Sequence, residues 1–224
     1  MREFCDRTEF LITHNRHDVF GFFVASFSRS GDELGQWRGY GDNGRGFAVG
    51  LNPCLFQSTD TADPTKPERN VLVAPVSYGE RNARMKHREA LRRAIAIMQK
   101  IVAIKEGRVL MLENEAEFTS KMCMELAVPL LWNSVTTKHD AYKAEREVRL
   151  IIVGHLPRFT SIETRIRKGE LVPFLRNHIS THRKADIVKV VVGPAAEDGV
   201  KNLLRAQGID PTRRVERSKI PYRG

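Results

Sequence analysis

The sequence is poor in cysteine. Its 224 residues include only Cys5, Cys54 and Cys123, which lie far apart and form no C-x-x-C pair. An odd number of widely spaced cysteines argues against the disulfide framework of a small secreted domain, and the paired spacing of a zinc knuckle is absent. We therefore expect a reducing, cytoplasmic environment and no bound metal.

Long apolar runs are also absent. No stretch approaches the roughly 18 to 20 apolar residues that a membrane-spanning helix needs. The residues after Met1 (REFCDRTEF) contain no apolar segment typical of a signal peptide. We expect a protein that is neither inserted in a membrane nor secreted.

Acidic residues are in the minority. The chain has 27 Asp and Glu against 37 Lys and Arg, and its formal net charge is +10. Such a charge raises the local concentration of polyanions, so nucleic acid is a candidate partner. Charge alone does not identify that partner, because many basic proteins bind no nucleic acid.

Strand and helix patterns are both present, without regular alternation. β-branched and aromatic runs predict strands at 19–28, 46–51, 71–78, 145–153, 186–193 and 213–218. Helices are predicted at 31–41, 80–106, 114–126 and 196–207. Helices that cluster centrally favour an α+β class, with a central twisted mixed sheet, over a doubly wound sheet. The length favours a single domain over 1–224 with a helical insertion at about 80–134.

Residues 80–106 have the pattern of a long basic amphipathic helix. Leu91, Ala94 and Ile95 belong to an apolar series with three- and four-residue steps, and no proline or glycine interrupts it before Gly107. The N-terminal half carries a dense basic face with four candidate phosphate contacts, Arg84, Arg88, Arg92 and Arg93. Positive charge is unfavourable near the positive end of the helix dipole, which favours an anionic partner. The other interpretation is a solvated face paired with acids.

The stretch GQWRGYGDNGRGF (35–47) contains a formal G-x-G-x-x-G in Gly39, Gly41 and Gly44. A dinucleotide-binding loop of this kind follows a strand and opens a helix. Here the predicted helix precedes the glycines and a strand follows them. Together with Gly46, the glycines predict a turn that needs positive φ and close backbone approach.

Two carboxylates stand two residues apart in AYKAEREVRLI (141–151). The period-two alternation of a strand places Glu145, Glu147 and Arg149 on one face, with the carboxylates about 7 Å apart along the strand. Like charges this close are tolerated when cations lie nearby or when a reaction requires them. The candidate cations are Arg149, Lys138 and Lys143.

This acidic pair has a structural and a functional interpretation. The structural one is a cross-strand ladder of salt bridges. The functional one is cleavage of the nicotinamide glycosidic bond, where one carboxylate holds the ribose hydroxyl and stabilises an oxocarbenium-like transition state. A second carboxylate then orients the acceptor. A metal nuclease would need a further acid and a lysine in a recognisable arrangement, which we do not find.

Five segments together resemble a widespread bacterial family of domains of unknown function. They follow the family's order over nearly the whole chain: SFS (26–28), WRGYGDNGRGF (37–47), KHDAYKAEREVRLI (138–151), VVVGP (190–194) and SKIPYR (218–223). A more distant resemblance is to ADP-ribosyltransferases. SFS is similar to the Ser-Thr-Ser strand that shapes the NAD pocket of those enzymes, and EREV is similar to their Glu-x-Glu.

The second resemblance implies an ADP-ribosyltransferase-like fold and a bacterial toxin or defence enzyme that uses NAD as a substrate. It implies that Glu147 is the catalytic acid and that Glu145 orients the acceptor. The NAD-binding residues would be Ser26, Ser28, Tyr40 and Arg149. Nucleic acid is a plausible acceptor because of the basic charge.

The first strand, which in those enzymes supplies an Arg or His that grips NAD, is not evident before SFS. His14, Arg16 and His17 are the available substitutes. Without that strand, a sheet edge is open for pairing with a protein partner. The alternative function is a non-catalytic nucleic-acid-binding or assembly module in which the acidic strand is structural.

Overall fold

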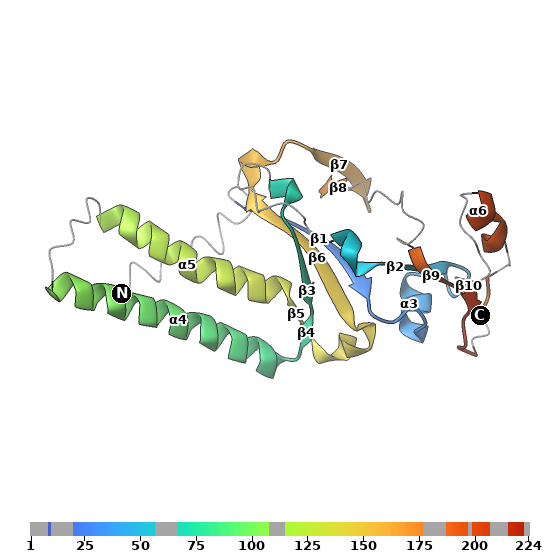
Figure 1. The fold of residues 1–224 in the computed structure, drawn as a ribbon, viewed down its shortest axis with the longest axis horizontal. Coiled ribbons are helices and arrows are strands. Elements are labelled where there is room, and N and C mark those ends of the chain that lie inside the picture. The colour runs from blue at the N-terminus through green and yellow to red at the C-terminus, as the bar shows by residue number, and fades with distance from the viewer. Residues whose placement is uncertain are drawn as a thin grey trace.

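The computed structural model describes residues 9, 20–56, 67–107, 115–176, 187–196, 199–206 and 215–221. The α+β class predicted from the sequence is confirmed (Figure 1). The single central sheet is not found among these residues, where the strands form two three-stranded and two two-stranded sheets. β6 is the central strand of one three-stranded sheet, and β9 is the central strand of the other. His14, Arg16 and His17 lie outside the described residues.

The first three-stranded sheet is antiparallel and has the order β1-β6-β3. β1 (Phe20–Ser28) pairs along its whole length with β6 (Glu147–His155). β3 (Val71–Pro75) pairs with the other edge of β6. Alternation along β6 sends Leu150 and Ile152 to one face, where they form an apolar cluster with Phe159 and the aromatic rings of β1.

The second three-stranded sheet is mixed and has the order β10-β9-β2. β9 (Ile187–Val192) pairs antiparallel with β2 (Phe47–Leu51) and parallel with β10 (Val215–Arg217). Val190 and Val192 of β9 are buried in a small core of their own. Among the described residues, each of the two larger sheets thus carries an apolar cluster of its own.

Two short pairings complete the strands. β4 (Ser77–Tyr78) runs parallel to β5 (Thr137–Lys138). β7 (Ile162–Arg167) and β8 (Glu170–Leu175) form an antiparallel hairpin that the sequence patterns did not predict. The connections that the structure describes include the 3-10 helices η1 (Pro53–Phe56), η2 (Pro67–Arg69), η3 (Asp140–Glu145) and η4 (Leu156–Arg158).

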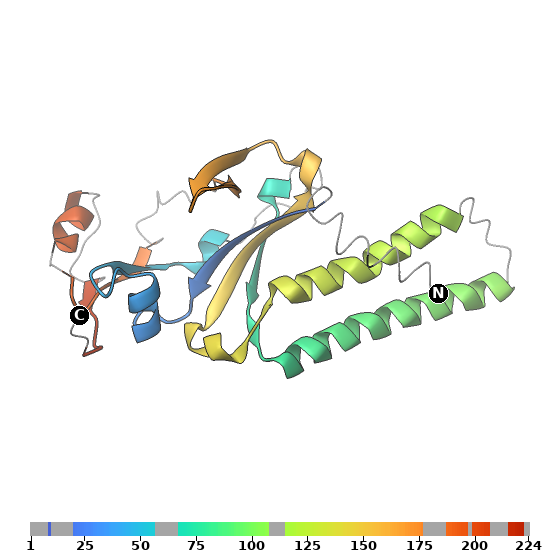
Figure 2. The ribbon, with the colours of Figure 1, turned by 180° about the vertical axis from the view of Figure 1, so that it is seen from behind.

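Two helices lie side by side and project away from the sheets (Figures 1 and 2). They are α4 (Glu80–Gly107) and α5 (Glu115–Val135). α5 continues past the predicted end at Leu126 and through Pro129. Burial of Leu126 and Leu131 on either side of this proline compensates for the hydrogen bond that proline cannot donate. None of the helices in the described ranges combines the length and apolar character needed to cross a membrane.

Two further helices in the described ranges are short. They are α3 (Leu34–Gly39), which precedes the glycine-rich stretch, and α6 (Val200–Ala206). Trp37 is the buried residue of α3, with 3% of its surface exposed. Its indole nitrogen donates a 2.8 Å hydrogen bond to Asp32. This buried ring anchors α3 against the rest of the chain.

The glycine-rich stretch is a turn between α3 and β2, as its position predicts. Gly44 has a φ of 83°. A Cβ atom on Gly193 would lie 2.2 Å from the Gly44 carbonyl oxygen, so the backbones touch closely at this point. Gly39 differs from the prediction, because a side chain there would meet no atom within 4 Å. Gly44 and Gly46 therefore serve close backbone packing against Gly193, the residue after β9.

Candidate functional site

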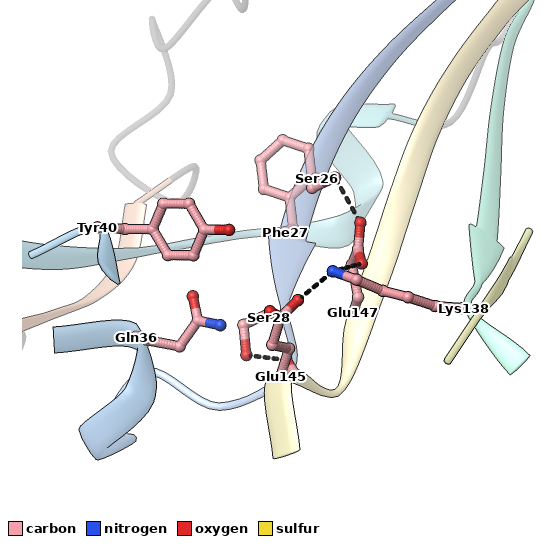
Figure 3. A pocket seen from close by; sticks show the side chains of 8 residues that line it. All are labelled: Ser26, Phe27, Ser28, Gln36, Tyr40, Lys138, Glu145 and Glu147. Carbon is pink, nitrogen blue, oxygen red and sulfur yellow. Dashed lines mark hydrogen bonds and ion pairs between the residues drawn. The ribbon is translucent and has the colours of Figure 1, made fainter. Parts of the chain in front are cut away.

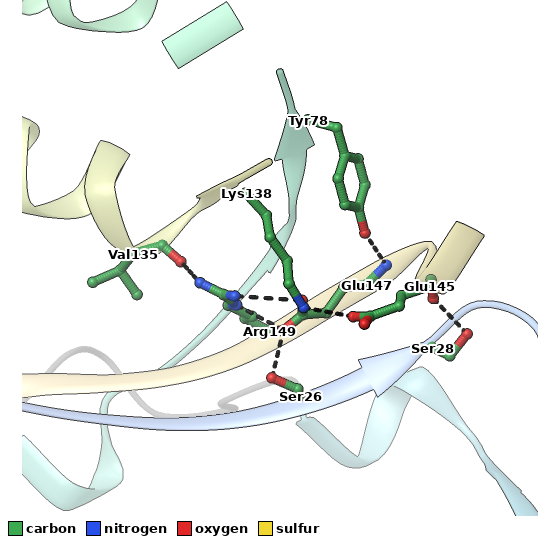
Figure 4. A network of polar contacts seen from close by, with 8 residues as sticks. All are labelled: Ser26, Ser28, Tyr78, Val135, Lys138, Glu145, Glu147 and Arg149. Carbon is green, nitrogen blue, oxygen red and sulfur yellow. Dashed lines mark hydrogen bonds and ion pairs between the residues drawn. The ribbon is translucent and has the colours of Figure 1, made fainter. Parts of the chain in front are cut away.

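The pairing of β1 with β6 gathers four of the six predicted catalytic and NAD-binding residues. In this register Ser28 is opposite Glu147, and Ser26 is opposite Arg149. Residues directly opposite each other in an antiparallel pair point to the same face of the sheet. The two serines and the two charged residues therefore share one face, near the end of the sheet (Figure 4).

Glu145 does not lie on this strand, which corrects the sequence prediction. It ends η3, and Arg146 after it has a left-handed backbone with a φ of 46°. This residue breaks the two-residue alternation before β6 begins at Glu147. The hydroxyl of Ser28 donates a 2.7 Å hydrogen bond to the Glu145 carbonyl and fixes the turn beside β1.

Lys138 forms ion pairs with both carboxylates, although Glu145 lies in η3 and Glu147 lies on β6. Its ammonium lies 2.6 Å from Glu145 Oε2 and 3.1 Å from Glu147 Oε2. It also lies 4.6 Å from the ring centroid of Tyr142, a cation–π contact. Burial lowers the pKa of Lys138, but the two carboxylates outweigh burial and raise it above its usual range. Of the predicted cations, Lys138 and Arg149 join the acids, whereas the Lys143 side chain is exposed.

Arg149 supports Glu147 from the other side. Its Nε lies 2.8 Å from Glu147 Oε1, and its second terminal nitrogen lies 3.3 Å from Oε2. The remaining terminal nitrogen donates to the carbonyl of Val135, at the C-terminal end of α5. Arg149 thus ties the acidic strand to a helix end, where positive charge is favourable. The Arg149–Glu147 pair lies along β6, and Lys138 reaches Glu147 from β5, so neither of these ion pairs connects the paired strands β1 and β6.

Glu147 is an almost fully buried anion, with 4% of its surface exposed. The hydroxyl of Ser26 donates a 2.5 Å hydrogen bond to its Oε1, and its backbone N–H donates a 2.7 Å bond to the hydroxyl of Tyr78. Burial raises the pKa of Glu147, but the hydrogen bonds from Arg149, Ser26 and Lys138 outweigh it and lower the pKa to about 2. The carboxylate is therefore ionised near neutral pH and accepts hydrogen bonds there.

A pocket of about 370 Å³ opens beside these groups (Figure 3). Strand β1 and the acidic turn form one part of its lining, and α3 and the turn after it contribute Gln36 and Tyr40. Tyr40 is 77% exposed, so its ring is available to a ligand. The lining residues are Ser26, Phe27, Ser28, Gln36, Tyr40, Lys138, Glu145 and Glu147. Arg149 is not among them and contacts the pocket only through Glu147.

Asp32 holds the α3 side of the pocket in place. Besides the Trp37 indole it accepts a 2.6 Å hydrogen bond from the Ser218 hydroxyl and a 2.8 Å bond from the Lys219 backbone. Burial raises the pKa of Asp32, but these bonds and the charge of Lys189 lower it overall. These bonds join the segment before α3 to Ser218 and Lys219, the first two residues of the SKIPYR segment.

Several contributors were not singled out from the sequence. Asp32, Gln36 and Tyr78 carry no local pattern that sets them apart from ordinary polar residues. The stretches around 37–47 and 218–223 did stand out as signatures, and Asp32 links them. The signal that pointed to Asp32 is its position close before the signature segment 37–47.

The four predicted phosphate-contacting arginines lie on α4 and not in the pocket lining. Arg84 lies 2.6 Å from Glu80, and Arg93 lies 2.9 Å from Glu89. Arg84 and Arg93 therefore fit the interpretation of a solvated helix face paired with acids. Arg88 and Arg92 are exposed. In the described ranges, no group of three or more His, Cys, Asp or Glu residues has the arrangement of a metal site.

Comparison with known proteins identifies the family of this chain. Residues 36–150, which include the turn after α3, η3 and the start of β6, match the family described as Protein of unknown function (DUF2971). No curated protein and no solved structure matches the chain. The match spans more than half of the sequence, and the chain belongs to this family of domains of unknown function.

Proposed function

We propose that this protein is an ADP-ribosyltransferase-like enzyme that uses NAD as a substrate, of the kind found among bacterial toxins and defence enzymes. One observation carries the proposal. Ser26 and Glu147, from paired strands, are joined by a hydrogen bond and both line a pocket. They belong to the segments that resemble the serine-rich strand and the Glu-x-Glu of those enzymes. An ADP-ribosyltransferase-like arrangement of the two larger sheets is part of the proposal.

The pocket suits the reacting half of NAD. A volume of about 370 Å³ lies at the lower end of the range of roughly 300 to 1,000 Å³ for small-molecule sites, so we place only nicotinamide and its ribose there. Tyr40 offers an exposed aromatic ring for stacking on nicotinamide. Ser28 supports the pocket wall through its bond to the Glu145 carbonyl.

The charge state of Glu147 defines its role in the reaction. Because its pKa is about 2, Glu147 is an anion near neutral pH, as the expected carboxylate role requires, and not a proton donor. It accepts a hydrogen bond from a ribose hydroxyl and stabilises positive charge that develops at C1′. The bond from C1′ to the nicotinamide nitrogen breaks, and its electron pair leaves with neutral nicotinamide. Arg149 is then a positioning residue that acts through Glu147.

Nicotinamide release by the purified protein tests the proposal. The reaction is followed with NAD alone and with added RNA, DNA or cell lysate. We expect release to fall by at least about a hundredfold in Glu147→Gln, since losing a transition-state charge contact costs on that order. Glu170→Gln is the matched control, because this exposed glutamate lies on the β7–β8 hairpin away from the pocket lining. Absence of release under every condition would refute the proposal.

A second candidate function follows from α4, interpreted as a long basic helix. Arg88 and Arg92 are exposed and one turn apart, so they share a face that suits phosphate contacts. This function is a non-catalytic nucleic-acid-binding or assembly module, in which Glu147 is structural and a protein partner completes a sheet edge. Binding would weaken steeply with salt, by about one unit of slope in log affinity per phosphate contact. Nucleic-acid binding would be unaffected by Glu147→Gln, whereas the enzymatic function predicts a strong loss of NAD consumption in that variant.

A further inference from the structure

We infer that Gln36 determines which substrate the pocket accepts, because its side-chain amide pairs with the carboxamide group of the departing base. This inference rests on the proposed function, which gives nicotinamide a stacking ring but no polar partner. It predicts a preference for a dinucleotide that carries a neutral carboxamide over one that carries a ketone or a carboxylate in its place.

Most polar side chains of the pocket lining already bond to other groups of the protein. The Ser26 hydroxyl donates to Glu147, and the Ser28 hydroxyl donates to the Glu145 carbonyl. The Lys138 ammonium is ion-paired with both carboxylates. These contacts hold the acidic wall of the pocket together and leave it little hydrogen-bonding capacity for a neutral base.

Gln36 differs from these residues. It lines the pocket, and its side-chain amide makes no hydrogen bond to another protein group within the ranges that the structure describes. Figure 3 shows this side chain directed from α3 toward β1. A primary amide carries two N–H donors and a carbonyl acceptor. Both kinds of group are therefore open to a ligand in the pocket.

The backbone holds Gln36 in a fixed position. Its N–H donates a 3.0 Å hydrogen bond to the Glu33 carboxylate, which caps α3. Its carbonyl accepts hydrogen bonds of 2.9 Å from the Tyr40 N–H and 3.1 Å from the Gly41 N–H. The next residue, Trp37, is the buried anchor of α3. Because these contacts constrain the backbone in advance, less conformational entropy is lost when the amide binds a ligand.

Gln36 and Tyr40 together suit an aromatic ring that carries a carboxamide. Tyr40 follows Gln36 by about one helical turn at the end of α3, and both line the pocket. Tyr40 offers an exposed ring on which the positively charged pyridinium of NAD can stack. A carboxamide complements the Gln36 amide fully, because it accepts one hydrogen bond and donates another. Two such bonds also fix the rotation of the base.

The charges of the lining oppose an acidic base. Glu145 and Glu147 stand against one cation, Lys138, which is already paired with both. The carboxylate of a nicotinic acid dinucleotide would add a third negative charge to this lining. It would also lack the N–H donors that the Gln36 carbonyl needs. A methyl ketone avoids the added charge but still leaves that carbonyl unpaired.

The test compares three dinucleotides with the full-length protein, using the acceptor that supports the fastest release from NAD. They are NAD, the acetylpyridine dinucleotide, in which a methyl ketone replaces the carboxamide, and the nicotinic acid dinucleotide. Release of the base at limiting substrate gives the relative kcat/KM of each. The three bases differ in reactivity as leaving groups. The quantity compared is therefore the change in each kcat/KM ratio between wild type and variant, in which that difference cancels.

Gln36→Met removes the amide and keeps a side chain of similar length. We expect the kcat/KM ratio of NAD to the acetylpyridine dinucleotide to fall by at least about fivefold, the order of one neutral hydrogen bond. This ratio is independent of the fraction of folded enzyme. Gln99→Met is the matched control, because this exposed glutamine of α4 is not part of the pocket lining and should leave the ratio unchanged.

Gln36→Arg provides a gain of specificity that partial unfolding does not mimic. A guanidinium at this position pairs with a carboxylate through two hydrogen bonds. We expect the kcat/KM ratio of NAD to the nicotinic acid dinucleotide to fall by at least about tenfold in this variant, the order of a close charge contact.

An unchanged ratio in either Gln36 variant would overturn the inference, while nicotinamide release that depends on Glu147 would still uphold the proposed function. Failure of the wild type to release nicotinamide from NAD with any acceptor would overturn both.

Discussion

The hydroxyl of Ser26 donates a 2.5 Å hydrogen bond to the carboxylate of Glu147, which follows 121 residues later in the chain. The bond joins the paired strands β1 and β6 at the pocket. It both stabilises the sheet and helps to keep Glu147 ionised. Four predictions follow from this network and from the glycine turn.

Replacing Ser26 by alanine removes one of the donors that keep Glu147 ionised. We expect a loss of about 1.5 to 3 kcal/mol in the free energy of unfolding, typical of a hydrogen bond to a charged group. The pKa of Glu147 should rise above about 2. Urea denaturation and NMR titration of the carboxyl carbon measure the two effects. Ser134→Ala, which removes an exposed hydroxyl bonded to a carbonyl of its own helix, should leave the Glu147 pKa unchanged.

The stability of the protein should depend on pH through Glu147. Its pKa falls from 4.5 to about 2 on folding, so the unfolded state takes up a proton first as pH drops. The contribution is fully present above about pH 5, declines as pH falls toward 2, and amounts to roughly 3 kcal/mol at most. Denaturation midpoints measured between pH 2 and 6 should show this loss in wild type. A Glu147→Gln protein with the same pH slope would contradict the assignment.

Removing Arg149 should be more harmful than removing both partners of its ion pair. Arg149→Met leaves Glu147 buried with one cation fewer and frees the Val135 carbonyl at the end of α5. We expect a cost of about 3 to 5 kcal/mol for this single variant. The double variant with Glu147→Gln should recover part of the loss, and urea denaturation of all four proteins completes the cycle. Strict additivity would show that the two side chains are not coupled.

The glycine turn offers a paired test of backbone packing. Gly193→Ala would place a Cβ atom 2.2 Å from the Gly44 carbonyl, and the backbone on both sides leaves little room to adjust. A cost of about 1 to 3 kcal/mol or more is expected from such overpacking. Gly39→Ala lies at the end of α3 in open space and should be neutral or slightly stabilising. Thermal unfolding of the two variants would distinguish them, and equal melting temperatures would refute the close approach.

The local pattern of the sequence was sufficient for much of the secondary structure. Apolar and β-branched alternation identified β1, β6 and β9, because each strand buries one or both faces of a sheet. It placed Glu147 and Arg149 on one face and indicated the cations that such a pair needs. The order of helix, glycines and strand was sufficient to predict a turn at 39–46 in place of a nucleotide-binding loop.

The assembly of the site depended on contacts between distant parts of the chain. The left-handed backbone at Arg146 moves Glu145 off the strand, and no alternation rule anticipates a single residue of this kind. Lys138 reaches both acids because the two-residue strand β5 is held beside β4, too short a pairing to leave a periodic signal. Periodicity reports which face of an element is buried, whereas the partner of that face is decided by packing across the whole chain. For this reason the residue types of the site could be predicted from the sequence, but its arrangement came from the tertiary structure alone.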